Sequence, residues 1–299
     1  MRLVAGAYPS YFDDPAATRD FLSALGSDDR FGALELPIRG TSDDLTWPEG
    51  AAESWGAVVT QIPGTMAAME ADEKFGLASS SVRGRANAVE FARHTFQRAQ
   101  ELRRSGHPVI AVELHSAPRH WCGARFLAES LSRIAKWDWG ETALVVEHCD
   151  AARQGYPAQK GFLELVEEID AVAEVSRGVQ TRLGVSLNWA RSAIETRSAR
   201  APYAHLFQAR QAGLLTGLMF SSVSPEQTSF GPEWVDAHLA PAGVSGAPDS
   251  SLLTALGIGE CLDALPESMI FLGFKVGLEG LNTPQERARA WSEMADLIH

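Results

Sequence analysis

Ionisable residues stand at the carboxyl ends of short apolar segments in this chain. The segment Val109–Leu114 contains Glu113 and is followed by His115, and the segment Ala143–Glu147 ends in a glutamate. Lys275 directly follows the last such segment. Alternate residues of a strand share a face, so Glu113 and His115 point the same way. Because an unpaired carboxylate is costly to bury, the pattern predicts a solvent-filled, ligand-binding mouth.

Four of these residues have the chemistry of proton transfer, and we take them as candidate catalytic residues. Glu147 or Glu113 could remove a proton from the carbon next to a carbonyl group. The Lys275 ammonium could stabilise the enediolate oxygen that develops, and His115 could move a proton between oxygens. Polar or aromatic residues at other strand ends and in one long loop are candidate substrate-binding residues: Tyr8, Glu35, Gln61, Asn188, Trp189, Ser221, Asp236 and His238.

Several of these residues also have a structural interpretation. Glu35 could pair with Arg39 or Lys275, and Trp189 could be part of the core instead of a platform for a sugar ring. His148 follows Glu147 and has the opposite parity, so we expect it to point into a surrounding helix layer.

Eight short apolar segments bounded by Gly, Pro or polar turns are the elements that must position the site. They are typical of strands buried on both faces, and we predict strands at Leu3–Ala7, Ala33–Leu36, Ala57–Ile62, Val109–Leu114, Ala143–Glu147, Leu183–Asn188, Leu215–Phe220 and Met269–Phe274. Amphipathic segments between them predict helices at Pro15–Leu25, Asn87–Ser105, Arg125–Trp137, Phe162–Ser176, Tyr203–Gly213, Ser250–Ala264 and Pro284–Ile298. A further helix is expected within Thr41–Trp55, where the pattern is least regular.

Alternation of strands and helices predicts a parallel sheet, and eight such units in 299 residues favour a closed (β/α)8 TIM barrel. We expect one domain over residues 1–299. A dinucleotide-binding sheet is not indicated, because Gly6–Tyr11 lacks the G-x-G-x-x-G pattern and Pro9 interrupts it. The stretch Ser221–Ser250, rich in Pro, Gly and Ser, predicts a long loop on the side where barrels keep their active sites.

Composition narrows the classes of partner. The net charge of −12 argues against nucleic acid or an anionic membrane surface as the main partner. Three cysteines with no CxxC pair indicate neither a disulfide scaffold nor a thiolate zinc site. The apolar run at the N-terminus is too short for a secretory signal, and no run reaches the length of a membrane span. We therefore expect a cytoplasmic protein that acts on a small molecule.

The arrangement resembles the xylose-isomerase-like barrel superfamily, which includes sugar isomerases, ketose 3-epimerases, inosose dehydratase-type enzymes and endonuclease IV. Gly32–Leu36, Leu144–Glu147, Gly184–Asn188 and the long loop after the seventh strand carry the resemblance. It implies a divalent metal held by Glu on strand five, Asp on strand six, His on strand seven and Glu on strand eight, which polarises the sugar carbonyl.

Only Glu147 matches that ligand set. Asn188 replaces the aspartate, Phe220, Ser221 or Ser222 stands where the histidine is expected, and Gly273 or Lys275 replaces the last glutamate. We therefore expect the usual four-ligand metal site to be absent and predict no cofactor. A rearranged Mn or Zn site of Glu113, His115 and Glu147 is the alternative.

Three functions follow as hypotheses. The first is a metal-independent isomerase or epimerase that acts on a small carbohydrate or an acidic sugar derivative. The second is a glycoside hydrolase or lyase that uses Glu113 and Glu147 as a carboxylate pair. The third is a barrel without catalytic activity that binds a sugar.

Overall fold

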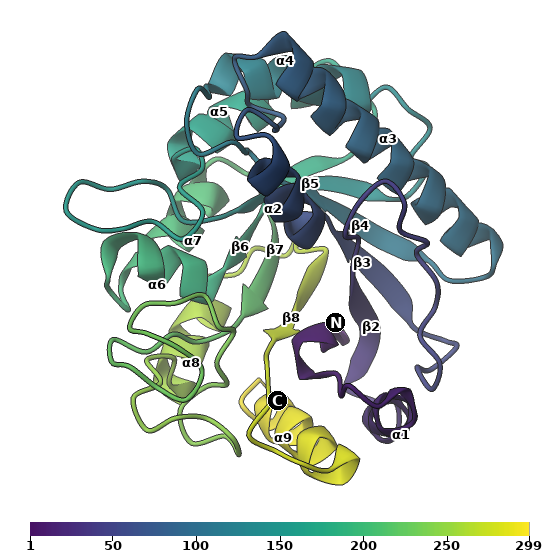
Figure 1. The fold of residues 1–299 in the computed structure, drawn as a ribbon, viewed down its shortest axis with the longest axis vertical. Coiled ribbons are helices and arrows are strands. Elements are labelled where there is room, and N and C mark those ends of the chain that lie inside the picture. Colours follow the sequence, from purple (N-terminus) through teal and green to yellow (C-terminus); the bar gives the residue numbers. More distant parts are fainter. Residues whose placement is uncertain (299) are drawn as a thin grey trace.

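The computed structural model describes residues 1–298, and its eight parallel strands close into a barrel in the order β1 to β8 (Figure 1). His299 lies outside the described residues. The strands are β1 Leu3–Gly6, β2 Phe31–Pro37, β3 Gly56–Thr60, β4 Val109–Leu114, β5 Ala143–His148, β6 Leu183–Asn188, β7 Leu215–Phe220 and β8 Phe271–Lys275. The predicted (β/α)8 TIM barrel is confirmed.

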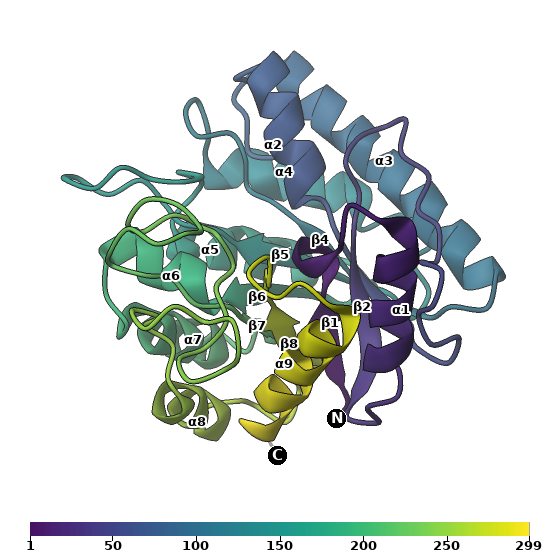
Figure 2. The same ribbon diagram turned by 60° about the horizontal axis from the view of Figure 1, so that its bottom comes forward.

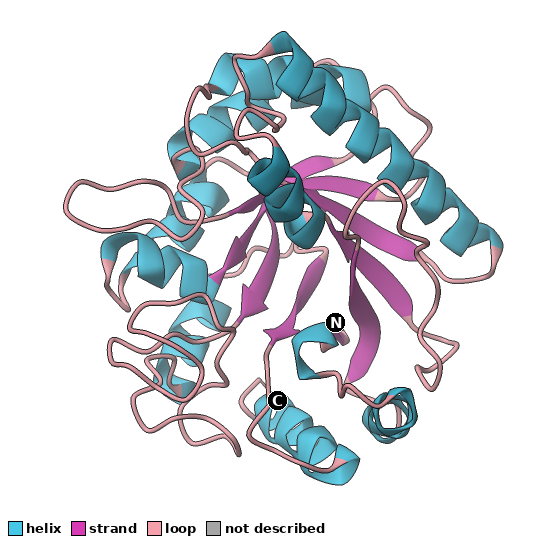
Figure 3. Ribbon diagram, in the orientation of Figure 1, coloured by secondary structure: helices cyan, strands magenta, loops and turns pink. Residues whose placement is uncertain are grey.

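Helices surround the barrel, as the colouring by secondary structure in Figure 3 shows. They are α1 Pro15–Leu25, α2 Ile62–Ala71, α3 Val82–Arg104, α4 Ala124–Ile134, α5 Leu165–Ser176, α6 Trp189–Thr196, α7 Ala201–Gln211, α8 Ala255–Asp263 and α9 Pro284–Asp296, with a short 3-10 helix η1 at Tyr8–Ser10. Their start signals are local: Asp14 caps α1 before Pro15, and Thr283 and Glu286 form a capping box on α9. None of the described helices combines the length and hydropathy needed to cross a membrane.

Two parts of the sequence prediction were wrong about helices. Thr41–Trp55 contains no helix; this segment, which includes Pro48 and Gly50, connects β2 to β3 as turns and irregular chain. The helices α2 and α6 were not predicted, because α6 follows β6 directly and only Gln61 separates α2 from β3. The bounds of β4, β6, β7 and α1 agree with the prediction.

The interior of the barrel has an apolar layer below a polar one. Side chains from seven strands form the apolar layer: Val4, Ala33, Val58, Ala111, Ala143, Val145, Met219 and Phe271. The Phe271 ring packs directly against Gly217, where a Cβ atom would lie 2.1 Å from the ring. Only a glycine at this position leaves room for the ring. Inward positions further along the strands place polar side chains above this layer, at the carboxyl ends.

Strands β1 and β8 pair and so close the barrel. In Figure 2 the helices α1 and α9, which pack against each other, lie in front of these two strands. A Cβ atom on Gly273 would lie 2.0 Å from the Val4 carbonyl oxygen, so only glycine permits this approach. Gly6 pairs with Lys275 across the same seam. A Cβ atom on Gly6 would lie 2.5 Å from Glu35 Oε2, so this glycine leaves room for a carboxylate inside the barrel.

The long segment between β7 and α8 folds over the carboxyl ends of the strands. Ser222 and Leu239 exchange backbone hydrogen bonds as an isolated antiparallel bridge. The Gly277 N–H, just after β8, donates to the His238 carbonyl oxygen at 2.9 Å. The segment therefore covers the barrel mouth from the side of β6 and β7 to the end of β8.

Candidate active site

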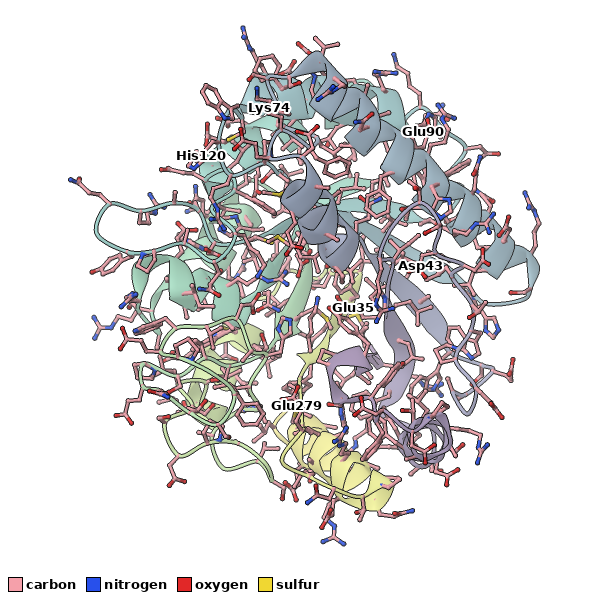
Figure 4. All side chains as sticks on the ribbon, in the orientation of Figure 1. Glu35, Asp43, Lys74, Glu90, His120 and Glu279 are labelled. Atoms are coloured by element: carbon pink, nitrogen blue, oxygen red, sulfur yellow. The ribbon has the colours of Figure 1, made fainter. Side chains whose placement is uncertain are left out.

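The polar layer of the barrel is buried and paired. Glu35, Glu113, Glu147 and Lys275 are each at most 1% exposed, and Figure 4 shows Glu35 within the ring of strands. The prediction of a solvent-filled mouth was therefore wrong for this structure. The reason is that cations and hydrogen-bond donors lie beside these carboxylates, which offsets the cost of their desolvation.

Glu147 is held by two partners, His115 and Arg191. Its Oε2 lies 2.7 Å from His115 Nε2, and its Oε1 lies 2.5 Å from Arg191 Nη1. Burial alone would raise the pKa of Glu147, but Arg191, Lys275 and His115 together hold it well below the ordinary value. Burial lowers the pKa of His115, so its ring is neutral. Because Glu147 is ionised, His115 donates Nε2–H to it, which leaves Nδ1 as an acceptor without a partner.

Glu113 has a different environment from Glu147. Its Oε1 accepts a hydrogen bond from Ser186 Oγ at 2.8 Å, and its Oε2 is buried without a partner. Burial, together with the charges of Glu147 and Glu35, raises the pKa of Glu113 well above the ordinary value. Two glutamates of one layer are thus driven toward opposite protonation states.

Lys275 is the cation at the centre of the seam between β8 and β1. Its Nζ donates to Glu35 Oε1 at 2.7 Å and lies 5.3 Å from the centroid of the Tyr8 ring. Burial would lower the pKa of Lys275, but Glu35, Tyr8 and Glu147 outweigh burial and raise it. The structural interpretation of Glu35, a pair with Lys275, is confirmed.

Asn188 ends β6 and also caps α6. Its Oδ1 accepts from Ser221 Oγ at 2.8 Å and from the Arg191 N–H at 3.3 Å, while its Nδ2 is buried without a partner. The cap fixes the first turn of α6, and this turn carries the Arg191 side chain back over the barrel mouth.

Arg191 and Lys160 are residues that the sequence analysis missed. The Arg191 guanidinium is 1% exposed and contacts both Glu147 and Asp236, with Nε 3.0 Å from Asp236 Oδ2. Lys160, from the loop before α5, donates Nζ to the same Asp236 oxygen at 2.9 Å. Arg191 lies three residues after Asn188, the last residue of β6, in the first turn of α6. A prediction that a helix begins directly after β6 would therefore have identified Arg191 as a candidate.

Asp236 and His238 lie at the barrel mouth. Both are candidates from the long loop after β7. Asp236 is 3% exposed, and His238 Nδ1 lies 3.3 Å from its Oδ1 without forming a hydrogen bond. Burial lowers the pKa of His238 to about 3, with Lys275 and Arg191 adding to burial and Asp236 opposing it. His238 is therefore neutral at pH 7.

Two candidate substrate-binding residues lie elsewhere. Gln61 turns toward the helix layer, where its Nε2 donates to Thr95 Oγ1 of α3 at 2.6 Å. Trp189 is 2% exposed and packs in the core between strands and helices, not on the mouth. Both are corrections, and their reason is parity: each residue follows a strand end whose inward position is already taken, by Thr60 or by Asn188.

His148 points outward, as predicted, and connects β5 to two helices. Its Nδ1 lies 2.7 Å from Glu168 Oε2 of α5, and its Nε2 lies 3.1 Å from Glu195 Oε2 of α6. Burial would lower the pKa of His148, but the two glutamates raise it to about 10. The three residues form a buried ion network behind the candidate site.

The residues at the superfamily's ligand positions do not fit a divalent cation. Both Glu147 oxygens contact His115 or Arg191, and Asn188 Oδ1 already accepts two hydrogen bonds. Lys275 places an ammonium group where a carboxylate ligand is expected. Among the described residues, His115 and Glu147 group with Cys149, not with Glu113, as donors within 4.8 Å of one another. Arg191 contacts both Glu147 and Cys149, so a cation already occupies this corner.

Comparison with known proteins places the chain in a family. The family described as "Domain of unknown function (DUF4862)" matches residues 4–289. The chain belongs to the DUF4862 family. An uncharacterized protein of Salmonella typhimurium is 38% identical to this DUF4862 chain over 230 residues, which are 75% of this chain and 70% of that protein.

Solved structures support the barrel. A candidate xylose isomerase from Rhodospirillum rubrum superposes with a TM-score of 0.61 at 11% identity, covering 100% of this chain and 98% of the other. A xylose isomerase domain containing protein from Salmonella typhimurium has a TM-score of 0.55 at 9% identity, covering 99% and 97%. The predicted resemblance to the xylose-isomerase-like superfamily is thus confirmed for the fold.

Proposed function

We propose that this DUF4862 chain is an isomerase or epimerase that transfers a proton at the carbon next to a carbonyl group of a small carbohydrate. The opposite pKa shifts of Glu113 and Glu147 carry the proposal. A proton-transferring site needs one carboxyl group whose pKa lies near the working pH, beside charges that do not titrate there. The pKa of Glu113 is raised by burial and by the charges of Glu147 and Glu35, while Glu147 stays ionised and Lys275 stays protonated.

Glu113 is the acid–base residue in this proposal. Ser186 holds one of its oxygens, and the other oxygen has no partner and can approach a substrate C–H bond. The raised pKa makes the ionised form a stronger base, and it also lets the protonated form return the proton. Glu147 is not the base, because His115 and Arg191 contact its two oxygens and stabilise the ionised form.

The Lys275 ammonium and the Arg191 guanidinium supply positive charge for the enediolate oxygens. Both are fully buried, so their charges act in a medium of low dielectric constant and need little reorganisation during the reaction. His115 Nδ1, which has no partner, can accept a proton from a substrate hydroxyl group. This assignment needs no metal ion.

The carbohydrate part of the proposal rests on the fold and on the lining of the site. Solved proteins of similar fold are described as a xylose isomerase domain containing protein and as a candidate xylose isomerase. Asn188 Nδ2 and Glu35 Oε2 are buried polar atoms without partners, and hydroxyl groups could pair with both. Because the site is buried, the substrate enters when the covering loops move.

The test is proton NMR of the protein with aldoses, ketoses and their acid derivatives in deuterated water. It follows product formation and exchange of the proton next to the carbonyl group. We expect Glu113→Gln to lower the rate by about 10²–10⁴-fold, the usual loss when an acid–base residue is removed. Glu279→Gln is the control, because Glu279 is exposed beyond β8 and the side chain is replaced in the same way.

Two outcomes would contradict the proposal. The first is a Glu113→Gln variant that exchanges the proton as fast as the parent chain. The second, which would overturn the metal-independent assignment, is activity that disappears with a chelator and returns with Mn²⁺. A sugar that binds but never exchanges or converts would support a barrel that only binds.

A further inference from the structure

Arg191 and Lys160 together hold a carboxylate at the barrel mouth. Asp236 Oδ2 accepts from Lys160 Nζ at 2.9 Å and from Arg191 Nε at 3.0 Å. The backbone of Lys160 is itself anchored, since its N–H and that of Gln159 donate to the Asp150 carboxylate. The two cations come from α6 and from the loop before α5, so neither belongs to the loop that carries Asp236.

Asp236 belongs to a segment with a strained backbone. Trp234 and His238, two residues to either side, have φ angles of +57° and +52°, a region that bulky side chains rarely adopt. The other carboxylate oxygen of Asp236 is buried without a hydrogen-bond partner. The loop is thus kept in place at some cost, by the two bonds that Asp236 accepts together with the backbone bonds of Leu239 and His238.

The position of this carboxylate links it to the candidate active site. Arg191 contacts Asp236 through Nε and Glu147 through Nη1, so the group bound at Nε lies directly beside the catalytic layer. A substrate that enters this layer must displace the segment around Asp236, because that segment covers the mouth. Lys160 and Arg191 then lose one negative partner while still partly buried.

We propose that Arg191 and Lys160 form a binding site for a substrate carboxylate, which Asp236 fills in the closed structure, so that the substrate is a sugar acid. This inference rests on the proposed function for the reaction but not for the binding. A sugar carboxylate restores the two bonds that Asp236 gives up, whereas a neutral sugar leaves both cations short of a partner. A carboxylate fits better than a phosphate, because the present occupant is itself a carboxylate with one charge, and one of its oxygens accepts both bonds.

The experiment is isothermal titration calorimetry with pairs of sugars that differ in one group. The probes are D-glucuronate against D-glucose and D-galacturonate against D-galactose, with D-glucose 6-phosphate as the phosphate arm. We expect at least one hexuronate to bind 10-fold or more tightly than its hexose and more tightly than the phosphate. Salt should weaken the hexuronate more than the hexose.

Two variants separate a binding site from a structural ion pair. Asp236→Asn removes the internal competitor, so we expect hexuronate affinity to rise about 10-fold while hexose affinity is unchanged. Lys160→Met removes one cation, so we expect the preference for the hexuronate to fall about 10-fold. Lys136→Met is the control, since Lys136 is exposed at the opposite end of the barrel and the change of charge is equal. Thermal unfolding of each variant shows that it is folded.

Each other outcome would overturn the inference. These are equal affinity for the acid and neutral sugars, binding of the phosphate alone, no binding of either hexuronate, or an Asp236→Asn variant that weakens both members of a pair. Failure of the proposed function is distinct from these, because calorimetry does not need turnover. A hexuronate preference without proton exchange would leave the carboxylate site standing and remove the isomerase.

Discussion

At the scale of single residues, neighbours decide what each glutamate does. Glu113 and Glu147 are each the last residue but one of adjacent strands, and both are buried. One lies beside a serine and two like charges, and the other lies beside an arginine and a histidine. Identical side chains therefore receive opposite pKa shifts, which is the division of roles that acid–base chemistry requires.

The raised pKa of Glu113 predicts a pH-dependent difference in stability between the parent chain and Glu113→Gln. A carboxyl group whose pKa is raised on folding contributes stability in full below its ordinary pKa of 4.5. That contribution is lost as pH rises through the higher folded value. Relative to the parent chain, the variant should gain about 1.4 kcal/mol per pH unit across this window.

Urea unfolding of both proteins from pH 4.5 to pH 9 measures the difference. The glutamine keeps the hydrogen bond with Ser186 and has the same shape, so the comparison isolates the charge. A difference that stays constant over the whole range would show that Glu113 has an ordinary pKa in the folded protein.

At the scale of elements, the ends of β5 and β6 contact both the barrel interior and the surrounding helices. Asn188 ends β6, caps α6 and so directs Arg191 over the mouth. On β5, Glu147 faces the interior while the next residue, His148, connects the strand to α5 and α6 through Glu168 and Glu195. The strand that presents Glu147 is therefore fixed from behind by an ion network.

We predict that His148→Gln destabilises the protein by about 3–5 kcal/mol near pH 6, because it leaves the buried Glu168 carboxylate without its cation and leaves Glu195 with Arg153 alone. The pKa of His148 is raised from 6.5 to about 10. Its stabilising contribution is therefore full below about pH 6.5 and is lost as pH rises to about 10.

The advantage of the parent chain over His148→Gln should thus shrink between those values, as measured by urea unfolding at pH 6 and pH 9.5. His120→Gln serves as the control, since His120 is exposed. An advantage of equal size at both pH values would mean that His148 is neutral in the folded protein.

At the scale of the whole molecule, closure of the barrel places the site. Glu35 on β2 meets Lys275 on β8 only because β1 lies between them and pairs with both strands. This first strand presents glycine at the level of the charges, which gives the Glu35 carboxylate its space.

Gly273→Ala tests the closure. The added Cβ atom would meet the Val4 backbone at 2.0 Å, so β8 and β1 must separate, and we expect a loss of about 1–3 kcal/mol or more in the free energy of unfolding. Gly259→Ala in α8 is the matched control: nothing lies within 4 Å of its Cβ position, and alanine favours a helix. The control should gain about 0.5–1 kcal/mol in denaturant unfolding. Equal stability of the two variants would mean that the seam is not tightly packed.

The sequence by itself determined the barrel and most of the polar layer. Short buried strands have a period of two and carry apolar residues on both faces, so both the strands and the inward parity of Glu35, Glu113, Glu147 and Lys275 can be recognised locally. Parity also separated His148 from Glu147. The helix bounds were less well predicted where a helix starts directly at a strand end, as α6 does after Asn188.

Only the tertiary structure decided how these charges are partnered. Arg191, Lys160 and Asp236 come from three separate loops and helix starts, and nothing in their local sequence reveals that one carboxylate joins them. Whether a buried glutamate is ionised depends on charges within a few ångströms, which folding brings together from distant parts of the chain. The sequence therefore determined which residues face the interior, and the fold decided which of them hold a proton and which cations remain for a ligand.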